Sequence, residues 1–143
     1  MVGKEASMGL MEFAQAEVIT LPPTARVSDA AALMADMNVG SVVVAEGMKP
    51  VGILTDRDIV VRVVRAGLDP DETPVFRVMT PEPLVLEEQM SLFEALEEVK
   101  HKGVRRYPIV DYEGNLVGIF TLDDVLQLLG LEMAAVARVV ERR

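Results

Sequence analysis

Two segments of the chain carry residues whose types and spacing suit the binding of a phosphorylated ligand. Asp58 follows Thr55 at the third position, and Asp124 follows Thr121 with the same spacing. In each segment a strand pattern gives way to a helical pattern, so the pair lies at a helix N-terminus, where unpaired N–H groups and the helix dipole attract an anion. The threonine hydroxyl can bond a phosphate, and the carboxylate can accept both hydroxyls of a ribose. The pairs therefore predict two sites for a nucleotide-like ligand.

The same spacing also has a purely structural explanation. A threonine followed three residues later by an acidic residue forms a capping box, in which both side chains satisfy the helix backbone. A single copy favours the cap, whereas two copies at the same junction favour a ligand site at the first pair and leave the cap and the ligand site equally open at the second pair. Arg57 beside Asp58 can offer its guanidinium to phosphate, while Asp123 beside Asp124 repels it. The first site is therefore expected to prefer the more anionic ligand.

The two pairs belong to an internal repeat. Residues 51–60 align with 117–126 at a shift of 66, and residues 30–39 align with 95–104 at a shift of 65. Within each unit, the periodicity of apolar residues and the turn residues predict the order strand, helix, strand, strand, helix. A unit of this length cannot bury both faces of its sheet, so we expect an α+β fold in which two β-α-β-β-α units pack sheet to sheet about a pseudo-two-fold axis.

The repeat also predicts the boundaries of the parts. They are an N-terminal extension at 1–15, a first repeat at 16–66, a linker with a short helix at 67–79, a second repeat at 80–130 and a C-terminal amphipathic helix at 131–143. Ser28 is expected to cap the first long helix, and Thr73 to cap a linker helix that runs from Pro74 to Met79, because these residue types favour those positions. Asn38 suits a left-handed helix end.

Composition narrows the function classes. The 143 residues carry a formal net charge of −9, and only 4% of them are aromatic, which argues against a nucleic-acid partner. No apolar run approaches the ~18 residues of a membrane span, and the N-terminus lacks a secretory pattern, so we expect a cytoplasmic protein without a membrane partner. The chain contains no cysteine, and its lone His101 stands between two lysines as a surface residue. No nucleophile–base pair or metal-ligand spacing appears, so we expect no enzyme.

Further motifs bring the repeat close to a known family. Both units carry Gly-Ile-x-Thr-x-x-Asp, at 52–58 and 118–124, and Val78-Met79-Thr80-Pro81 precedes the second unit where Phe13-Ala14-Gln15 precedes the first. Over about residues 16–129 the chain resembles a tandem CBS-domain pair, or Bateman module, of the small stand-alone prokaryotic type. The resemblance implies a non-catalytic regulatory module that binds AMP, ADP, ATP or S-adenosylmethionine between its repeats, with no obligatory cofactor, and signals occupancy to a dimer or to an effector protein.

The resemblance also implies which residues bind the ligand. The first pocket would consist of Gly52, Thr55, Arg57 and Asp58 with the strand residues Ile19, Thr20 and Val42. The second pocket would consist of Gly118, Thr121 and Asp124 with the strand residues Leu84, Val85 and Tyr107. Arg105 and Arg106 would reach phosphates in a central cleft, or else form a solvated strand end.

Apolar helix faces predict self-association. A homodimer through helices is expected from the residues Ile59, Val60, Val63, Leu126 and Leu129. In the tail, residues 131–140 are expected to tune this association, and residues 138–143 are expected to be dispensable for folding. The alternative to a ligand sensor is a ligand-free dimerisation or scaffold module whose Thr-x-x-Asp corners are only helix caps.

Overall fold

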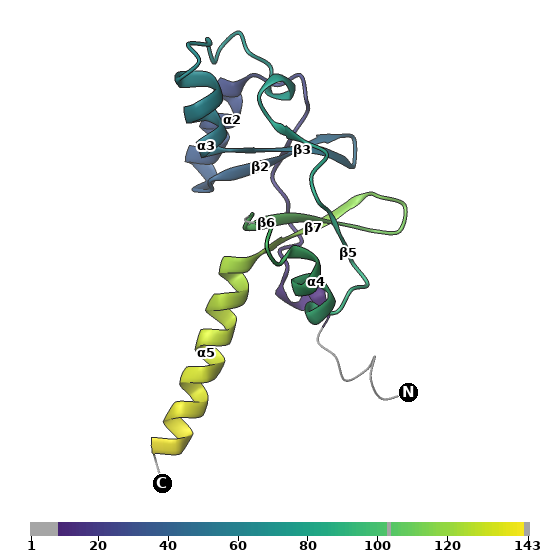
Figure 1. The fold of residues 1–143 in the computed structure, drawn as a ribbon, viewed down its shortest axis with the longest axis vertical. Coiled ribbons are helices and arrows are strands. Elements are labelled where there is room, and N and C mark those ends of the chain that lie inside the picture. Colours follow the sequence, from purple (N-terminus) through teal and green to yellow (C-terminus); the bar gives the residue numbers. More distant parts are fainter. Residues whose placement is uncertain (1–8, 103, 142–143) are drawn as a thin grey trace.

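The computed structural model describes residues 9–102 and 104–141, which fold into two stacked halves with a long helix projecting from one of them (Figure 1). The first half contains α2 (Val27–Met37), β2 (Ser41–Glu46), β3 (Lys49–Thr55) and α3 (Asp56–Ile59). The second half contains α4 (Leu92–Val99), β6 (Arg106–Val110), β7 (Leu116–Thr121) and α5 (Leu122–Glu141). The α+β fold of two β-α-β-β-α repeats is therefore confirmed. The boundaries between domains stay a prediction.

Each half is organised around an antiparallel hairpin, β2–β3 or β6–β7. In the first sheet the strand order is β1 (Thr20–Leu21), β2, β3, β4 (Thr80–Pro81), and in the second it is β5 (Leu86–Glu87), β6, β7. Both β1 and β5 run parallel to their neighbours. The register of each hairpin shifts once, between Val44 and Ala45 and between Ile109 and Val110, which are equivalent places in the repeat.

The segments that lead into the two repeats cross to the opposite half. We call residues 13–15 and 78–81 the lead-in segments. Gln15 precedes the first repeat but pairs with Ile119 of β7, with N···O distances of 3.0 and 2.9 Å. Thr80 precedes the second repeat but pairs with Ile53 of β3. Each sheet therefore has an edge that comes from the segment leading into the other repeat.

Two glycines of the repeat signature allow this crossing. A Cβ atom on Gly118 would lie 3.0 Å from the backbone oxygen of Gln15, and a Cβ atom on Gly52 would lie 2.3 Å from the sulfur of Met79. Both distances are shorter than ordinary contacts, so the lead-in segments can lie this close only to a residue without a side chain.

Apolar side chains form one core in each half and a smaller contact between the halves. The first core includes Val63, which is completely buried, so the expected place of Val63 on a dimerisation face is wrong. The second core includes Leu10 and Phe13 from a 3₁₀ turn, η1 (Leu10–Phe13), within the expected N-terminal extension. Residues 1–8 of that extension lie outside the described residues. Val43, Leu116 and Ile119 pack between the two sheets.

The start of α2 and the linker helix differ from the expectation. Helix α2 begins at Val27, because the N–H of Arg26 donates to the carboxylate of Asp29 at 3.1 Å, so Asp29 rather than Ser28 closes its first turn. Asn38 ends α2 in the left-handed conformation, as predicted, with φ 54°.

The linker forms one 3₁₀ turn, η3 (Val75–Arg77), instead of a helix over 74–79. The N–H groups of Val75 and Phe76 donate to the carbonyls of Ala25 and Pro23, so they are tied to the segment before α2. The Thr73 hydroxyl donates to the carbonyl of Asp69 at 2.7 Å and does not cap a helix.

The last helices of the two repeats also differ from each other. After α3, the first repeat continues as a π-helical turn, η2 (Val60–Val64). The second repeat ends in α5, which runs without interruption through Gly130 into the expected C-terminal helix and extends away from the body (Figure 1). Residues 142–143 of that expected helix lie outside the described residues. No helix in the described ranges is long and apolar enough to cross a membrane.

Candidate functional site

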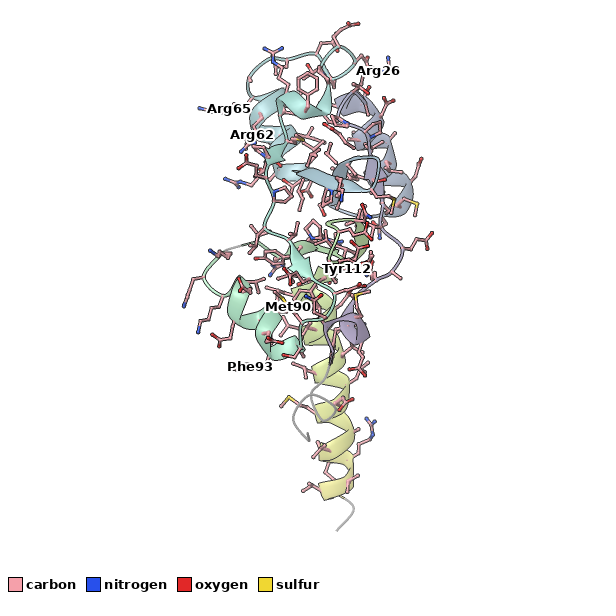
Figure 2. All side chains as sticks on the ribbon, turned by 90° about the vertical axis from the view of Figure 1, so that its right-hand side faces the viewer. Arg26, Arg62, Arg65, Met90, Phe93 and Tyr112 are labelled. Atoms are coloured by element: carbon pink, nitrogen blue, oxygen red, sulfur yellow. The ribbon has the colours of Figure 1, made fainter. Side chains whose placement is uncertain are left out.

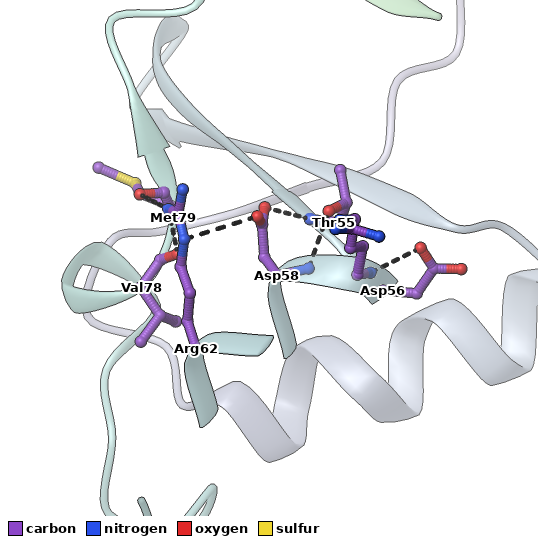
Figure 3. Close-up of polar contacts among 7 residues, drawn as sticks. Thr55, Asp56, Asp58, Arg62, Val78 and Met79 are labelled. Atoms are coloured by element: carbon purple, nitrogen blue, oxygen red, sulfur yellow. Dashed lines mark hydrogen bonds and ion pairs between the residues drawn. The ribbon is translucent and has the colours of Figure 1, made fainter. Parts of the chain in front are cut away.

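The first Thr-x-x-Asp corner forms a complete capping box at the start of α3 (Figure 3). The Thr55 hydroxyl accepts from the N–H of Asp58 at 3.1 Å, and the Asp58 carboxylate accepts from the N–H of Thr55 at 3.0 Å. The corner forms here because a strand that ends in threonine passes directly into a helix whose first N–H groups need acceptors. The cap therefore exists, and its side chains are held in fixed positions.

A guanidinium links this corner to the opposite lead-in segment. Arg62 lies one turn after Asp58, with its Nε 3.8 Å from a carboxylate oxygen, and donates to the carbonyls of Val78 and Met79 at 3.0 and 3.2 Å (Figure 3). The Asp58 side chain is only 14% exposed, so the ion pair is partly shielded from solvent. Arg62 thereby joins α3 of the first repeat to the backbone that leads into the second.

The first corner opens into a cavity of about 370 Å³ between the repeats, which we call the ligand cavity. Its lining residues are Ile53, Thr55, Asp58, Thr80, Glu82, Pro83, Leu84, Lys102, Val104, Arg106 and Tyr107. The polar corner of the first repeat thus faces apolar residues of the second. A volume of this order suits a small-molecule site, which typically occupies roughly 300–1,000 Å³.

This grouping differs from the expected one. Thr55 and Asp58 share the ligand cavity with Leu84 and Tyr107, which were assigned to the second pocket. Val42 is 2% exposed in the first core and Ile19 packs against that core, so neither lines the cavity. The reason is the crossing of the lead-in segments, which brings each corner against the opposite repeat.

Four more of the expected residues lie outside the ligand cavity. Thr20 is paired with Val43 in the first sheet, and Val85 lies next to β5; neither lines the cavity. Gly52 and Gly118 lie beneath the lead-in segments, as described above, which gives both a structural role in packing.

A second hollow, the central cleft, adjoins the ligand cavity. It measures about 540 Å³ and shares Ile53, Thr55, Val104 and Arg106 with the ligand cavity. Arg57 and Asp56 of the first repeat and Arg105 and Asp123 of the second line it as well, so three arginines and two aspartates meet in one cleft. The arginines outnumber the aspartates by one, and guanidinium groups reach the cleft from both repeats, which suits phosphate oxygens.

The second Thr-x-x-Asp corner has the same hydroxyl cap but a different partner for its carboxylate. The Thr121 hydroxyl accepts from the N–H of Asp124 at 3.1 Å. The Asp124 carboxylate accepts from the side-chain amide of Gln15 at 2.8 Å. Asp123 pairs with Arg105 at 3.6 Å on the surface. A lead-in residue therefore occupies one oxygen of the carboxylate that would have to meet a ribose.

Burial of Tyr107 shapes the apolar wall of the ligand cavity. Its side chain is 2% exposed, and its hydroxyl donates to the carbonyl of Val104 at 2.7 Å. Burial raises the pKa of the Tyr107 phenol above its usual value, because the phenolate is poorly solvated there. The ring is therefore fixed as a neutral surface at physiological pH.

Several residues of the site were not predicted from the sequence. Arg62 holds Asp58, Gln15 holds Asp124, and the unpredicted residues that line the ligand cavity are Ile53, Thr80, Glu82, Pro83, Lys102 and Val104. For Gln15 a signal existed, since it occupies the place in the first lead-in segment that Thr80 has in the second. Among the described residues, no group of acidic, histidine or cysteine side chains could hold a metal ion.

Comparison with known proteins is consistent with this geometry. The CBS domain family matches the chain twice, over residues 10–65 and 75–131. The chain belongs to this family. The uncharacterized protein MK0525 of Methanopyrus kandleri is 41% identical over 123 residues, which cover 85% of this chain and 63% of MK0525. CBS domain-containing protein YhcV of Bacillus subtilis is 41% identical over 109 residues, which cover 76% of each chain.

A solved CBS structure has a similar fold. The CBS domain protein PAE2072 from Pyrobaculum aerophilum, crystallised in complex with AMP, superposes with a TM-score of 0.76 and 25% identity over 90% of this chain and 99% of that chain. The chain is accordingly a CBS-domain pair, a regulatory type of module.

Proposed function

We propose that this CBS pair is a non-catalytic sensor that binds an adenosine-containing ligand in the ligand cavity and transmits occupancy to a dimer or an effector protein. The observation that carries the proposal is that Thr55 and Asp58 line one cavity together with the apolar residues Leu84 and Tyr107. The carboxylate suits a ribose, and the apolar walls suit a flat base. A ligand held this way contacts both repeats at once, so its binding favours one packing of the repeats over another.

The charges nearby support a phosphorylated ligand. Arg106 lines both the ligand cavity and the central cleft, so a phosphate attached to the ribose can extend from one into the other. Arg57 and Arg105 lie further along the cleft, where second and third phosphates would be placed. AMP, ADP and ATP all match this layout, and the AMP complex of PAE2072 supports the same ligand class.

A second candidate function is supported by the capping box. The two hydrogen bonds between Thr55 and Asp58 satisfy backbone N–H groups at the start of α3, so both side chains already have a structural role as a helix cap. In that case the module would be a dimerisation or scaffold unit that binds no nucleotide.

Thermal unfolding with AMP, ADP, ATP and S-adenosylmethionine separates the two candidates. A ligand at a hundredfold excess over its Kd stabilises the folded state by about 2.7 kcal/mol, which corresponds to a midpoint shift of roughly 5–10 °C for a chain of this size. If Asp58 binds the ribose, Asp58→Ala removes most of that shift, because a charge-assisted contact is lost.

Asp29→Ala is the matched control, because Asp29 also caps a helix but lies on α2, outside the ligand cavity. Both substitutions are expected to lower the free energy of unfolding without ligand by about 1 kcal/mol, because a helix cap is lost. Only Asp58→Ala should reduce the shift in thermal midpoint that a ligand produces. An equal shift in the parent chain and in both variants would show that the corner is only a cap. No shift with any of the four ligands would favour the scaffold function.

A further inference from the structure

Helix α5 carries a seven-residue repeat of apolar residues along one face. The positions alternate in steps of four and three residues, and they are Leu122, Leu126, Leu129, Met133, Val136 and Val140. Such spacing keeps one apolar stripe facing a partner helix over the whole length of a left-handed coiled coil. We call this stripe the seam.

The described chain leaves the seam uncovered. From Leu126 to Val140, the five seam residues are between 43% and 72% exposed, and Val125 is the only buried residue of α5 in the described ranges. Helix α5 projects from the body, so no other described element packs along its outer part (Figure 1). A helix with so much exposed apolar surface is normally covered by a partner.

We propose that α5 pairs with α5 of a second copy of this chain in an antiparallel two-helix coiled coil centred near Leu131. Centring there places Leu126 opposite the partner's Val136 and Leu129 opposite the partner's Met133. In every layer, a seam residue that is followed by a three-residue step then packs against a seam residue that is followed by a four-residue step, as antiparallel packing requires. Gly130 and Ala137 flank the seam, and their small side chains let the two backbones approach closely.

The two ends of α5 favour the antiparallel direction. The helix begins with Asp123 and Asp124, whereas its last described turn carries both Arg138 and Glu141. Antiparallel pairing keeps the two acidic starts apart, and it also opposes the helix dipoles. A parallel pair would bring the two acidic starts together.

An apolar groove continues the seam at the base of α5. The groove measures about 660 Å³ between α4 and the start of α5, and Phe93, Leu96, Val99 and Leu122 form part of its wall. Phe93 is 72% exposed and lies on α4 beside this groove (Figure 2). In the antiparallel pair, the partner's Val140 lies opposite Leu122, so the end of the partner helix covers the mouth of the groove.

Cross-linking of single-cysteine variants tests both the partner and the direction, because the chain contains no cysteine of its own. A short bismaleimide should join Leu126→Cys to Val136→Cys when the two variants are mixed. It should not join Leu126→Cys to itself, because residues 126 and 136 are about 15 Å apart along a helix axis. Leu131→Cys is the matched control, since this equally exposed leucine faces away from the seam.

A covalent dimer of mixed Leu126→Cys and Val136→Cys, absent from each variant alone and from Leu131→Cys, is the expected result. Self-linking of Leu126→Cys would overturn the antiparallel direction, and the absence of any linked dimer at tens of micromolar would overturn the pairing. Circular dichroism of each variant confirms that α5 is still folded, so a failure to link is interpretable. Neither result bears on nucleotide binding, which is measured separately.

A second measurement uses uncharged helix-forming substitutions. Leu126→Gln should weaken dimerisation at least tenfold in sedimentation equilibrium, and Leu131→Gln should change it less than twofold. Both leucines are similarly exposed, at 66% and 63%, so exposure alone predicts equal effects. Equal weakening by the two variants would contradict the seam.

Discussion

The two Thr-x-x-Asp corners share a sequence pattern and a hydroxyl cap, but their carboxylates have different neighbours. Asp58 is held by the Thr55 backbone and by Arg62, and it faces a cavity lined by the other repeat. Asp124 is bonded to Gln15 of the lead-in segment, and Asp123 stands beside it. In the first corner the equivalent lead-in residue is Thr80, whose shorter side chain lines the cavity. The motif therefore supplies two similar helix starts, each beside a hollow, of about 370 Å³ at Asp58 and about 360 Å³ at Asp124, and the segments crossing over them decide which neighbours each carboxylate has.

The largest expected effect concerns the glycines that allow this crossing. Gly118→Ala should lower the free energy of unfolding by about 1–3 kcal/mol, because the new Cβ would lie 3.0 Å from the backbone oxygen of Gln15. Gly52→Ala should cost less, because its Cβ meets the side chain of Met79, which can move. Urea unfolding measures both.

The double variant Gly52→Ala with Met79→Ala sharpens that contrast. It should lose less stability than the sum of the two single changes, since the clash disappears with the methionine side chain. Strictly additive losses would mean that the close contact between Gly52 and Met79 does not cause the loss of stability in Gly52→Ala.

The next effect concerns charge at the two corners. Arg57→Ala should weaken ATP binding about threefold to tenfold more than AMP binding, because a cation is lost from the central cleft. Asp123→Ala should instead strengthen ATP binding relative to AMP binding, since it removes a negative charge and frees Arg105 from its ion pair. Isothermal titration at one fixed salt concentration gives the ratio of the two Kd values. A ratio unchanged in both variants would show that the cleft does not contact the outer phosphates.

A smaller effect is expected from Gln15→Ala. Loss of its exposed bond to Asp124 should lower stability by about 1 kcal/mol or less. The freed carboxylate should then permit a second, weaker AMP binding event in titration. Gln15→Ala combined with Asp124→Ala is the control and should lack this event. An unchanged number of AMP molecules bound per chain in Gln15→Ala would mean that Gln15 is not what prevents AMP from binding at Asp124.

The smallest effect appears only at high pH. Because burial raises the pKa of Tyr107, the folded state keeps a proton that the unfolded chain loses near its ordinary pKa of about 10. The contribution of Tyr107 to stability is thus complete below that pH and is lost as pH rises through the folded pKa.

Tyr107→Phe should therefore reduce the fall in stability above pH 10 in denaturant titrations. Tyr112→Phe, which changes the 87% exposed tyrosine of the second hairpin turn, should leave that fall unchanged. The same pH profile in both variants would contradict a special role for the buried phenol.

Local sequence patterns were sufficient to predict the order of elements. The hairpins, the helices that follow them and the left-handed end at Asn38 all depend on residues close together in the chain. Where local signals compete, the prediction failed. Ser28 and Asp29 both suit the start of α2, and the longer acidic side chain reaches the Arg26 N–H.

The composition of the ligand cavity could not be derived from local patterns. Leu84 and Tyr107 line the same cavity as Asp58 because the lead-in segments cross between the halves, and nothing in the spacing within one repeat specifies that crossing. Equally, the linker at 73–79 begins with the helix-start residues Thr73 and Pro74, but the N–H groups of Val75 and Phe76 bond to the carbonyls of Ala25 and Pro23. Long-range backbone pairing overrides local preference in both cases.

The crossing of the lead-in segments bears on how such a molecule arises. A gene for one repeat would produce a polypeptide whose leading strand has no place on its own sheet. That strand would have to be exchanged with a second molecule in a swapped dimer. Tandem duplication of the gene turns this exchange between molecules into one within a single chain, at a high effective concentration that no longer depends on dilution. On this account the pseudo-two-fold axis relating the repeats corresponds to the symmetry axis of such a swapped dimer.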